Sequence, residues 1–133
     1  MLSVFPQLFT YQEIAPVLLR VVLGVAFVLH GYPKLFGGFG ATAQFFSSVG
    51  IKPAKFWVAV VGIVEFFGGA ALLVGIFTQA AALLIAVNMA VALLVVKRKQ
   101  GFVGGYELDL AFLAMALALL LLGPGLWSID LPL

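Results

Sequence analysis

The sequence predicts an all-α integral membrane protein, a bundle of four helices that each cross a bilayer. The first observation is composition: of 133 residues, 65% are hydrophobic and only 9% are charged, with a mean hydropathy of +1.26. Soluble domains are close to half apolar and a quarter charged, so a water-soluble globule of this size could not bury so much hydrocarbon. The second observation is that the apolar residues gather in four long runs. Each run is long enough to cross about 30 Å of hydrocarbon as a helix.

The predicted helices cover 14–32, 56–76, 80–96 and 108–122 within a single domain, 1–133. The runs are rich in Leu and Ala, and an open sheet would leave backbone groups unpaired in lipid, so helices are expected. Glycine, proline or charged residues separate the runs at Pro33, 37–40, 75–79, 97–101 and 123–125. Because the break at 75–79 is short, the second and third helices should form a tight antiparallel hairpin.

The longest connection, 34–55, places Phe39, Phe45, Phe46 and Ile51 between polar residues. This pattern predicts a partly interfacial loop that contains a short helix or a re-entrant segment. The first apolar run does not resemble a cleaved signal peptide, because no basic residue precedes it and Arg20 lies inside it. We therefore expect the first helix to be a permanent span.

The distribution of cations predicts the orientation of the bundle. Six cations lie in the first and third connections: Lys34, Lys52, Lys55, Lys97, Arg98 and Lys99. The N-terminus, the second connection and the C-terminus hold none. By the positive-inside rule, both termini are expected outside the cytoplasm. So few cations are not typical of nucleic-acid binding, and the absence of cysteine excludes a thiolate metal site or a cysteine-ligated iron–sulfur cluster.

Function is expected at the polar residues within or near the ends of the spans. These are Arg20, His30, Glu65, Asn88, Glu107 and Asp109. A charge at the bilayer centre costs about 3 kcal/mol even on lenient insertion scales, so each such residue needs a partner, a cavity or a function. Arg20, His30 and Lys34 fall on one stripe of the first helix and should face the bundle together. Glu107 and Asp109 lie on opposite sides of a helix, and Glu107 is expected to be the inward one.

Glu65 lies mid-span beside Gly68 and Gly69, which leave room for another helix or a bound molecule. Two interpretations remain open for it. Glu65 is either a functional carboxylate, or a structural one in an ion pair with Arg20 or a hydrogen bond to His30 or Asn88.

The other polar residues also carry two interpretations each. His30 is either a proton-transfer group, since imidazole exchanges protons near neutral pH, or a hydrogen-bonded core histidine. A single imidazole is too little for a bis-histidine haem or a metal site. An asparagine in the middle of a span, such as Asn88, is more typical of an interhelical hydrogen bond than of a contact to a ligand. Lys34 and 97–99 are typical of anchors at the lipid headgroups.

Several blocks of the sequence resemble the DoxX family of small four-helix membrane proteins of bacteria and archaea. They are HGYPKLFGGFG (30–40), VGIVEFFGGAALLVG (61–75), GGYELD (104–109) and GPGLWSID (123–130). The resemblance runs from about 18 to 130 and implies the four-helix fold. Family members are usually labelled oxidoreductases; some relatives form the membrane part of a thiosulfate:quinone oxidoreductase, and others associate with terminal quinol oxidases or redox-stress defence. The resemblance also implies candidate site positions at Arg20, His30, Lys34, Glu65 and Glu107.

Two hypotheses of function follow. In the first, the protein is a redox subunit that binds quinone or quinol in a polar-lined cavity between the helices. The catalytic residues would be His30, Glu65 and Arg20, while Asn88 and Glu107 would help to bind the quinone; no metal is expected. Arg20 or His30 would hydrogen-bond a quinone carbonyl, and Glu65 with His30 would relay protons from the cytoplasmic side. The electrons would come from a substrate or a partner subunit, as in a thiosulfate:quinone oxidoreductase.

In the second hypothesis, the protein is a structural or assembly subunit of a membrane respiratory or redox-defence complex, without catalysis of its own. A small transporter or ion-binding protein is a third, weaker option. The expected partners are the lipid bilayer and either other membrane redox subunits or further copies of this chain. The expected location is the prokaryotic cytoplasmic (inner) membrane, as a multi-pass protein. A closed bundle with a Glu65–Arg20 ion pair would favour the structural hypothesis, and a cavity lined by Arg20, His30 and Glu65 would favour the first.

Overall fold

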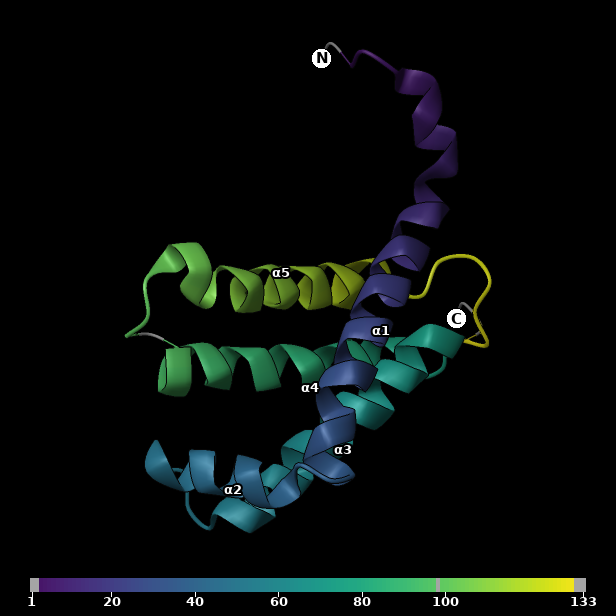
Figure 1. The fold of residues 1–133 in the computed structure, drawn as a ribbon. Helices are drawn as coiled ribbons and strands as arrows, with labels where there is room; N and C mark the ends of the chain where they lie inside the picture. Colours follow the sequence, from purple (N-terminus) through teal and green to yellow (C-terminus); the bar gives the residue numbers. More distant parts are fainter. Residues whose placement is uncertain (1–2, 98, 131–133) are drawn as a thin grey trace.

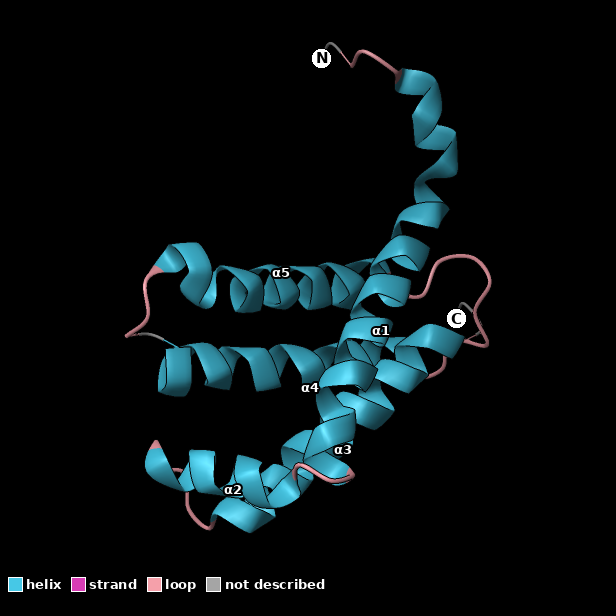
Figure 2. Cartoon of the chain, viewed as in Figure 1, coloured by secondary structure: helices cyan, strands magenta, loops and turns pink. Residues whose placement is uncertain are grey.

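The computed structural model describes residues 3–97 and 99–130, and these form five α-helices with short 3-10 and π-helical segments (Figure 1). In chain order the elements are η1 (3-10, Pro6–Ile14), α1 (Ala15–Leu35), α2 (Phe39–Ser48), α3 (Ala54–Val74), α4 (Thr78–Val91), η2 (π, Ala92–Lys97), η3 (π, Phe102–Tyr106) and α5 (Glu107–Leu122). The described residues contain no strand (Figure 2).

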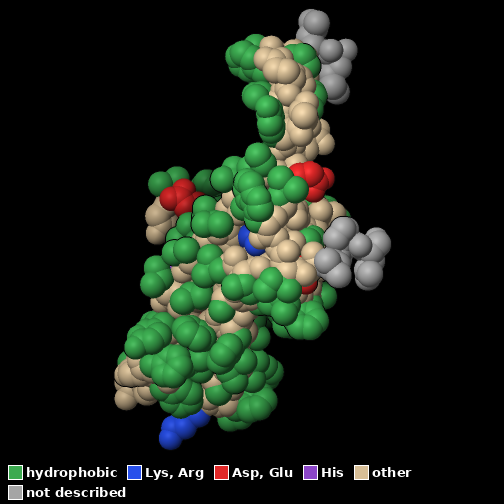
Figure 3. Space-filling view, turned by 90° about the vertical axis from the view of Figure 1, so that its right-hand side faces the viewer, with side chains coloured by type: hydrophobic (Ala, Val, Ile, Leu, Met, Phe, Trp, Pro, Cys, Tyr) green, Lys and Arg blue, Asp and Glu red, His purple; other side chains and the backbone are tan. Residues whose placement is uncertain are grey.

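Four stretches of the described chain are long and apolar enough to cross a bilayer. They are Pro6–Leu35, Ala54–Val74, Thr78–Lys97 and Phe102–Leu122. On the face shown in Figure 3, hydrophobic side chains spread over the whole helical body and charged ones are few. An exterior of this kind suits lipid rather than water as the solvent. The predicted all-α fold with four membrane-spanning helices is therefore confirmed.

The helices pack in two pairs, α1 with α3 and α4 with α5; α4 and α5 lie side by side, and α1 runs obliquely to them (Figure 1). All four spans contribute to one buried cluster. Its largest members are Leu23 and Phe27 of α1, Leu72 of α3, Ile85 of α4, and Phe112 and Leu119 of α5. Since lipid is as apolar as these side chains, close packing rather than burial from water holds the pairs together.

The helix boundaries differ from the predicted ones where glycine, rather than proline, sets the end. α1 continues past Pro33 to Leu35 and ends before Gly37, whose φ of +106° is not helical. Pro33 removes only one backbone hydrogen bond, which a last turn can lose. Gly75 and Phe77 both have left-handed dihedral angles and form the tight α3–α4 turn, so the predicted hairpin is confirmed.

The connection 34–55 contains the predicted short helix, α2. Ala43 and Phe46 of α2 pack against Val58 of α3 in a small separate cluster. Among the described residues α2 packs against α1 and α3 but not against α4 or α5. Its position relative to the bilayer stays a prediction, as does the orientation of the termini. Arg98, one of the six cations used for that orientation, lies outside the described residues.

Candidate functional site

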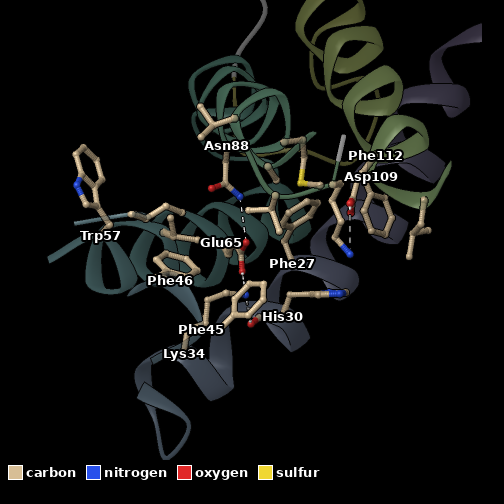
Figure 4. Close-up of a pocket in the computed structure, with 18 of the residues that line it drawn as sticks. Phe27, His30, Lys34, Phe45, Phe46, Trp57, Glu65, Asn88, Asp109 and Phe112 are labelled. Carbon is tan, nitrogen blue, oxygen red and sulfur yellow. Dashed lines mark hydrogen bonds and ion pairs between the residues drawn. The ribbon is translucent and has the colours of Figure 1, made fainter. Parts of the chain in front are cut away.

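Glu65 lies in the middle of the stripe that α3 turns towards the other helices. The buried residues of α3 recur three or four positions apart: Val58, Gly62, Glu65, Gly69 and Leu72. Because Glu65 is only 6% exposed, its carboxylate needs partners from the protein. Each oxygen has one: Lys34 Nζ lies 2.7 Å from Oε2, and Asn88 Nδ2 donates a hydrogen bond to Oε1 at 3.0 Å (Figure 4).

These three residues, the Glu65 cluster, join three helices. Lys34 lies in the last turn of α1 and Asn88 lies in α4. Lys34 Nζ also donates to the backbone oxygen of His30 at 3.1 Å. Hydrogen bonds that involve a charged group are about twice as strong as neutral ones, so the cluster fixes the relative position of the helices. Of the partners considered for Glu65, the structure shows Asn88 and not Arg20, and it adds Lys34, which the sequence favoured as a lipid anchor.

The Glu65 cluster lines a cavity of about 520 Å³. The cavity lies in the space that α2 leaves by not packing against α4, and its walls come from all five α-helices. The aromatic lining residues are Phe27, Phe45, Phe46, Trp57 and Phe112, and the polar ones are His30, Lys34, Glu65, Asn88, Lys97 and Asp109 (Figure 4). A mainly apolar cavity of this size with a few polar groups is the usual form of a small-molecule site.

Asp109, not Glu107, faces the cavity. Lys97 Nζ lies 3.8 Å from Asp109 Oδ2, and this buried oxygen has no hydrogen-bond partner among the described residues. The side chain of Glu107 is exposed, and its Oε1 accepts a hydrogen bond from the backbone amide of Gly104 at 3.2 Å. The prediction that Glu107 is the inward residue is therefore wrong. Glu107 begins α5 and bonds to the turn before the helix, where a carboxylate also suits the helix dipole.

His30 lines the cavity with an exposed side chain, so it is not a core histidine. Its Nδ1 lies 2.6 Å from the backbone oxygen of Ala26. A carbonyl oxygen only accepts, so Nδ1 carries the hydrogen. No hydrogen bond to Nε2 is present within the described ranges, and this atom can accept a proton. The ring centroids of Phe27 and Phe112 both lie 6.2 Å from the imidazole.

Arg20 does not belong to the cavity. It is 1% exposed, and among the described residues its guanidinium donates only to backbone carbonyls. Nε bonds Pro124 O at 2.8 Å, Nη1 bonds Leu72 O at 3.2 Å, and Nη2 bonds Leu126 O at 2.7 Å and Trp127 O at 3.1 Å. The expectation that Arg20 joins His30 and Glu65 is wrong. Arg20 shares a buried face of α1 with Lys34, but 14 residues at 1.5 Å each separate the two by about 21 Å along the helix.

The C-terminal segment that Arg20 holds also caps α4. The carboxylate of Asp130 accepts hydrogen bonds from the backbone amides of Phe77 at 2.7 Å and Thr78 at 2.8 Å. Burial disfavours the charged carboxylate of Asp130 and would raise its pKa. Hydrogen bonds from Thr78 and from the amide of Phe77, together with the charge of Arg20, outweigh this effect, so the pKa of Asp130 lies below its ordinary value. This end of the bundle is therefore a structural closure, distinct from the cavity.

A signal for Asp109 was present in the sequence. The buried stripe of α5 consists of Phe112, Ala116 and Leu119, and Asp109 lies three residues before Phe112, on the same stripe. The spacing of the apolar residues could have identified Asp109 as the inward carboxylate. No such signal exists for Phe46 and Trp57, because their place depends on how α2 and the start of α3 pack.

The arrangement can bind a flat, largely apolar molecule and exchange protons with it. Aromatic side chains form the walls, Lys34 and Asn88 are donors, and Glu65, Asp109 and His30 Nε2 are acceptors. In the described part of the chain, no three His, Asp or Glu side chains are grouped closely enough to hold a metal ion.

Comparisons with known proteins agree with the resemblance seen in the sequence. The DoxX family model matches residues 15–98, which include the whole Glu65 cluster. A protein of Bacillus subtilis (strain 168) named "Putative oxidoreductase CatD" is 35% identical over 118 residues, which cover 89% of this chain and 86% of the relative. "Uncharacterized membrane protein Rv3486" of Mycobacterium tuberculosis (strain ATCC 25618 / H37Rv) is 30% identical over 125 residues, 84% of this chain and 77% of the relative. No solved structure gave a significant match. The chain is a membrane protein that belongs to the DoxX family.

Proposed function

We propose that the cavity binds the head group of a quinone or quinol and that the protein is the quinone-linked part of a membrane oxidoreductase. The observation that carries the proposal is the Glu65 cluster, an ion-paired carboxylate at the wall of a mainly aromatic cavity of about 520 Å³. The aromatic walls suit a flat ring, and the cavity is not fully enclosed, which leaves an exit for an apolar tail. The redox class in the name of the Bacillus relative supports the proposal.

The polar groups of the cavity have two roles in the proposed reaction, as hydrogen-bond donors to the quinone and as groups that exchange protons with it. Reduction of a quinone to a quinol takes two electrons and two protons. Lys34 and Asn88 can donate hydrogen bonds to a carbonyl oxygen, while Glu65, Asp109 and His30 can exchange protons with the two ring oxygens. The electrons come from a reduced substrate or a partner subunit, because the sequence holds no cysteine and has no redox-active side chain beyond its aromatic ones. Arg20 has no part in this site, because the bonds that its side chain makes to the described residues all go to backbone carbonyls.

The same proposal gives the protein a location and partners. Both relatives are bacterial, and the cations lie on two connections, so we place the protein in the prokaryotic cytoplasmic membrane. Its partners are another membrane redox subunit, which would supply the electrons, or further copies of this chain.

The two tryptophans allow a direct test of binding. Trp57 lines the cavity, whereas Trp127 lies in the C-terminal segment held by Arg20. In purified Trp127→Phe protein, a short-tailed ubiquinone or menaquinone analogue should quench the fluorescence of Trp57 in a saturable way. In Trp57→Phe protein the same titration should show only the weak, linear quenching of quinone dissolved in the detergent. Equal quenching of both proteins would contradict the proposal.

Substitutions of carboxylates test the site itself. In the Trp127→Phe background, Glu65→Gln and Asp109→Asn should each weaken binding about tenfold, the effect of losing one hydrogen bond to a charged group. Glu107→Gln is the matched control and should bind as well as its parent, because Glu107 lies outside the cavity. Thermal unfolding of each variant shows whether the bundle is intact. If the parent protein binds no quinone, the structural or assembly role is the better interpretation.

A further inference from the structure

The N-terminal segment before α1 stands clear of the helical body (Figure 1). None of the nine residues of η1 is buried. Phe5, Leu8, Phe9 and Tyr11 are each more than half exposed. A kink at Tyr11 (φ −103°, ψ 19°) separates the first part of the segment from the line of α1. This apolar segment therefore has no covering partner within the described part of the chain.

The length of α1 places this segment at the edge of the hydrocarbon. α1 has 21 residues, and at 1.5 Å each they span about 31 Å, close to the thickness of the hydrocarbon core. η1 therefore adjoins the end of α1 at which the helix leaves the hydrocarbon core. From Ser3 to Gln12 the segment has no charged residue, which suits the boundary between hydrocarbon and headgroups.

The 3-10 geometry gives η1 two chemically different faces. A 3-10 helix has three residues per turn, so side chains three apart lie above one another. Up to the kink at Tyr11, one face gathers Phe5, Leu8 and Tyr11 and another gathers Gln7 and Thr10, while Pro6 and Phe9 lie on the third. At the α-helical spacing of 3.6 residues, the same rows would wind around the axis. Figure 3 shows the hydrophobic side chains of the projecting segment along one edge.

Other exposed aromatic residues lie at the same end of the bundle. The backbone amide of Leu126 donates to Glu13 O at 3.2 Å, so the C-terminal segment meets the base of η1. Trp127 in that segment is 74% exposed, and Phe77 of the adjoining α3–α4 turn is 72% exposed. The described cations of the connections, Lys34, Lys52, Lys55, Lys97 and Lys99, lie at the other end. Exposed Trp and Tyr are enriched at both membrane interfaces, and the interface without exposed cations lies opposite the positive one.

We propose that η1 lies in the plane of the membrane interface, at the end of the bundle that holds Arg20. Phe5, Leu8 and Tyr11 enter the lipid, and Gln7 and Thr10 face the headgroups and water. The occupant of the apolar face is the bilayer itself. An amphipathic helix of this kind anchors the end of α1 and fixes its depth in the membrane.

Because the chain has no cysteine, single cysteines can be introduced and spin-labelled without background. The test uses Phe5→Cys and Leu8→Cys on the apolar face and Gln7→Cys and Thr10→Cys on the polar face, in vesicles of phosphatidylethanolamine and phosphatidylglycerol. Collisions with oxygen report lipid, and collisions with a water-soluble nickel chelate report water. The ratio of oxygen to nickel collisions should be several-fold higher on the apolar face.

Two labelled controls calibrate the scale: Val25→Cys on the exposed surface of α1 and Lys52→Cys in the first connection. Phe5→Cys and Leu8→Cys should lie between these limits. Equal nickel access at all four positions would place the segment in water and overturn the proposal. Immobile labels at Leu8 that neither reagent reaches would show that a protein surface covers the face, which also overturns it. Neither result depends on whether the cavity binds quinone.

Discussion

At the scale of single residues, Arg20 and Glu65 show two ways to bury a charge. Within the described ranges, Arg20 bonds only to backbone carbonyls, which cannot accept or release a proton. Glu65 bonds to two side chains, Lys34 and Asn88, that can turn towards a bound molecule without unfolding a helix. The first arrangement suits a fixed structural tie, and the second suits a site where protons move. Hydropathy alone does not distinguish them, because both residues are isolated charges in apolar runs.

The structural role of Arg20 predicts a large loss of stability on its removal. Arg20→Ala removes a donor from four carbonyl oxygens, of which, in the described part of the chain, only that of Leu72 keeps another bond, from Gly75 N. We therefore expect the free energy of unfolding to fall by about 3 kcal/mol or more. Arg20→Lys keeps a charge but not the forked guanidinium, so its loss should be intermediate. Thermal unfolding in detergent measures both. In the Arg20→Lys protein, quinone should still quench the fluorescence of Trp57. Loss of this quenching in a folded Arg20→Lys protein would show that Arg20 belongs to the quinone site.

At the scale of elements, glycine determines how closely α1 and α3 approach. A Cβ added to Gly69 would lie 2.7 Å from Val28 N and 2.8 Å from Gly24 O. A Cβ on Gly31 would meet the backbone of Phe66. These contacts are to backbone atoms, which cannot move aside as a flexible side chain can. Small residues at such contacts let membrane helices gain van der Waals packing that lipid does not offer.

Replacement of these glycines should separate the α1–α3 pair. Gly69→Ala should lower the free energy of unfolding by about 1–3 kcal/mol, the usual cost of overpacking. Gly40→Ala is the matched control on α2, where an added Cβ meets nothing within 4 Å. Since alanine favours helix over glycine by up to about 1 kcal/mol, the control should be neutral or slightly stabilised. Equal unfolding temperatures for the two variants in the same detergent would refute the close contact.

The sequence predicted the elements better than their contacts. Run length and glycine placement were enough for the four spans, the α3–α4 hairpin and the short helix α2. The ion-pair partner of Glu65 was not predictable, because Lys34 lies 31 residues away and meets it through the packing of α1 against α3. The cavity depends on α2 packing against α3 rather than α4, which hydrophobic periodicity does not encode. Asp109 is the exception, since the apolar spacing of α5 contained the information.

At the scale of the whole molecule, charge divides the protein into two ends with different tasks. The end with the cations holds the Glu65 cluster, Lys97 and Asp109 around the cavity. The opposite end is closed by backbone carbonyls on Arg20 and by Asp130 on the start of α4. A proton-handling site near the cationic end would exchange protons with the compartment on that side. The orientation of the chain therefore decides which compartment supplies protons to the proposed reaction.

The positive-inside rule predicts that this compartment is the cytoplasm, with both termini outside. Single cysteines can test this without removing any cation: Ser3→Cys and Ile129→Cys near the termini, and Ser48→Cys and Gln100→Cys near the connections. These side chains are exposed in the structure. In intact bacterial cells, a membrane-impermeant maleimide should label only the first pair, and the second pair should react only after permeabilisation.

Six cations lie in the two connections and none in the termini or the second connection, so we expect all molecules to have the same orientation. Labelling of all four positions in intact cells would show two orientations, and the reverse pattern would place the cavity end outside; either would refute proton supply from the cytoplasm alone.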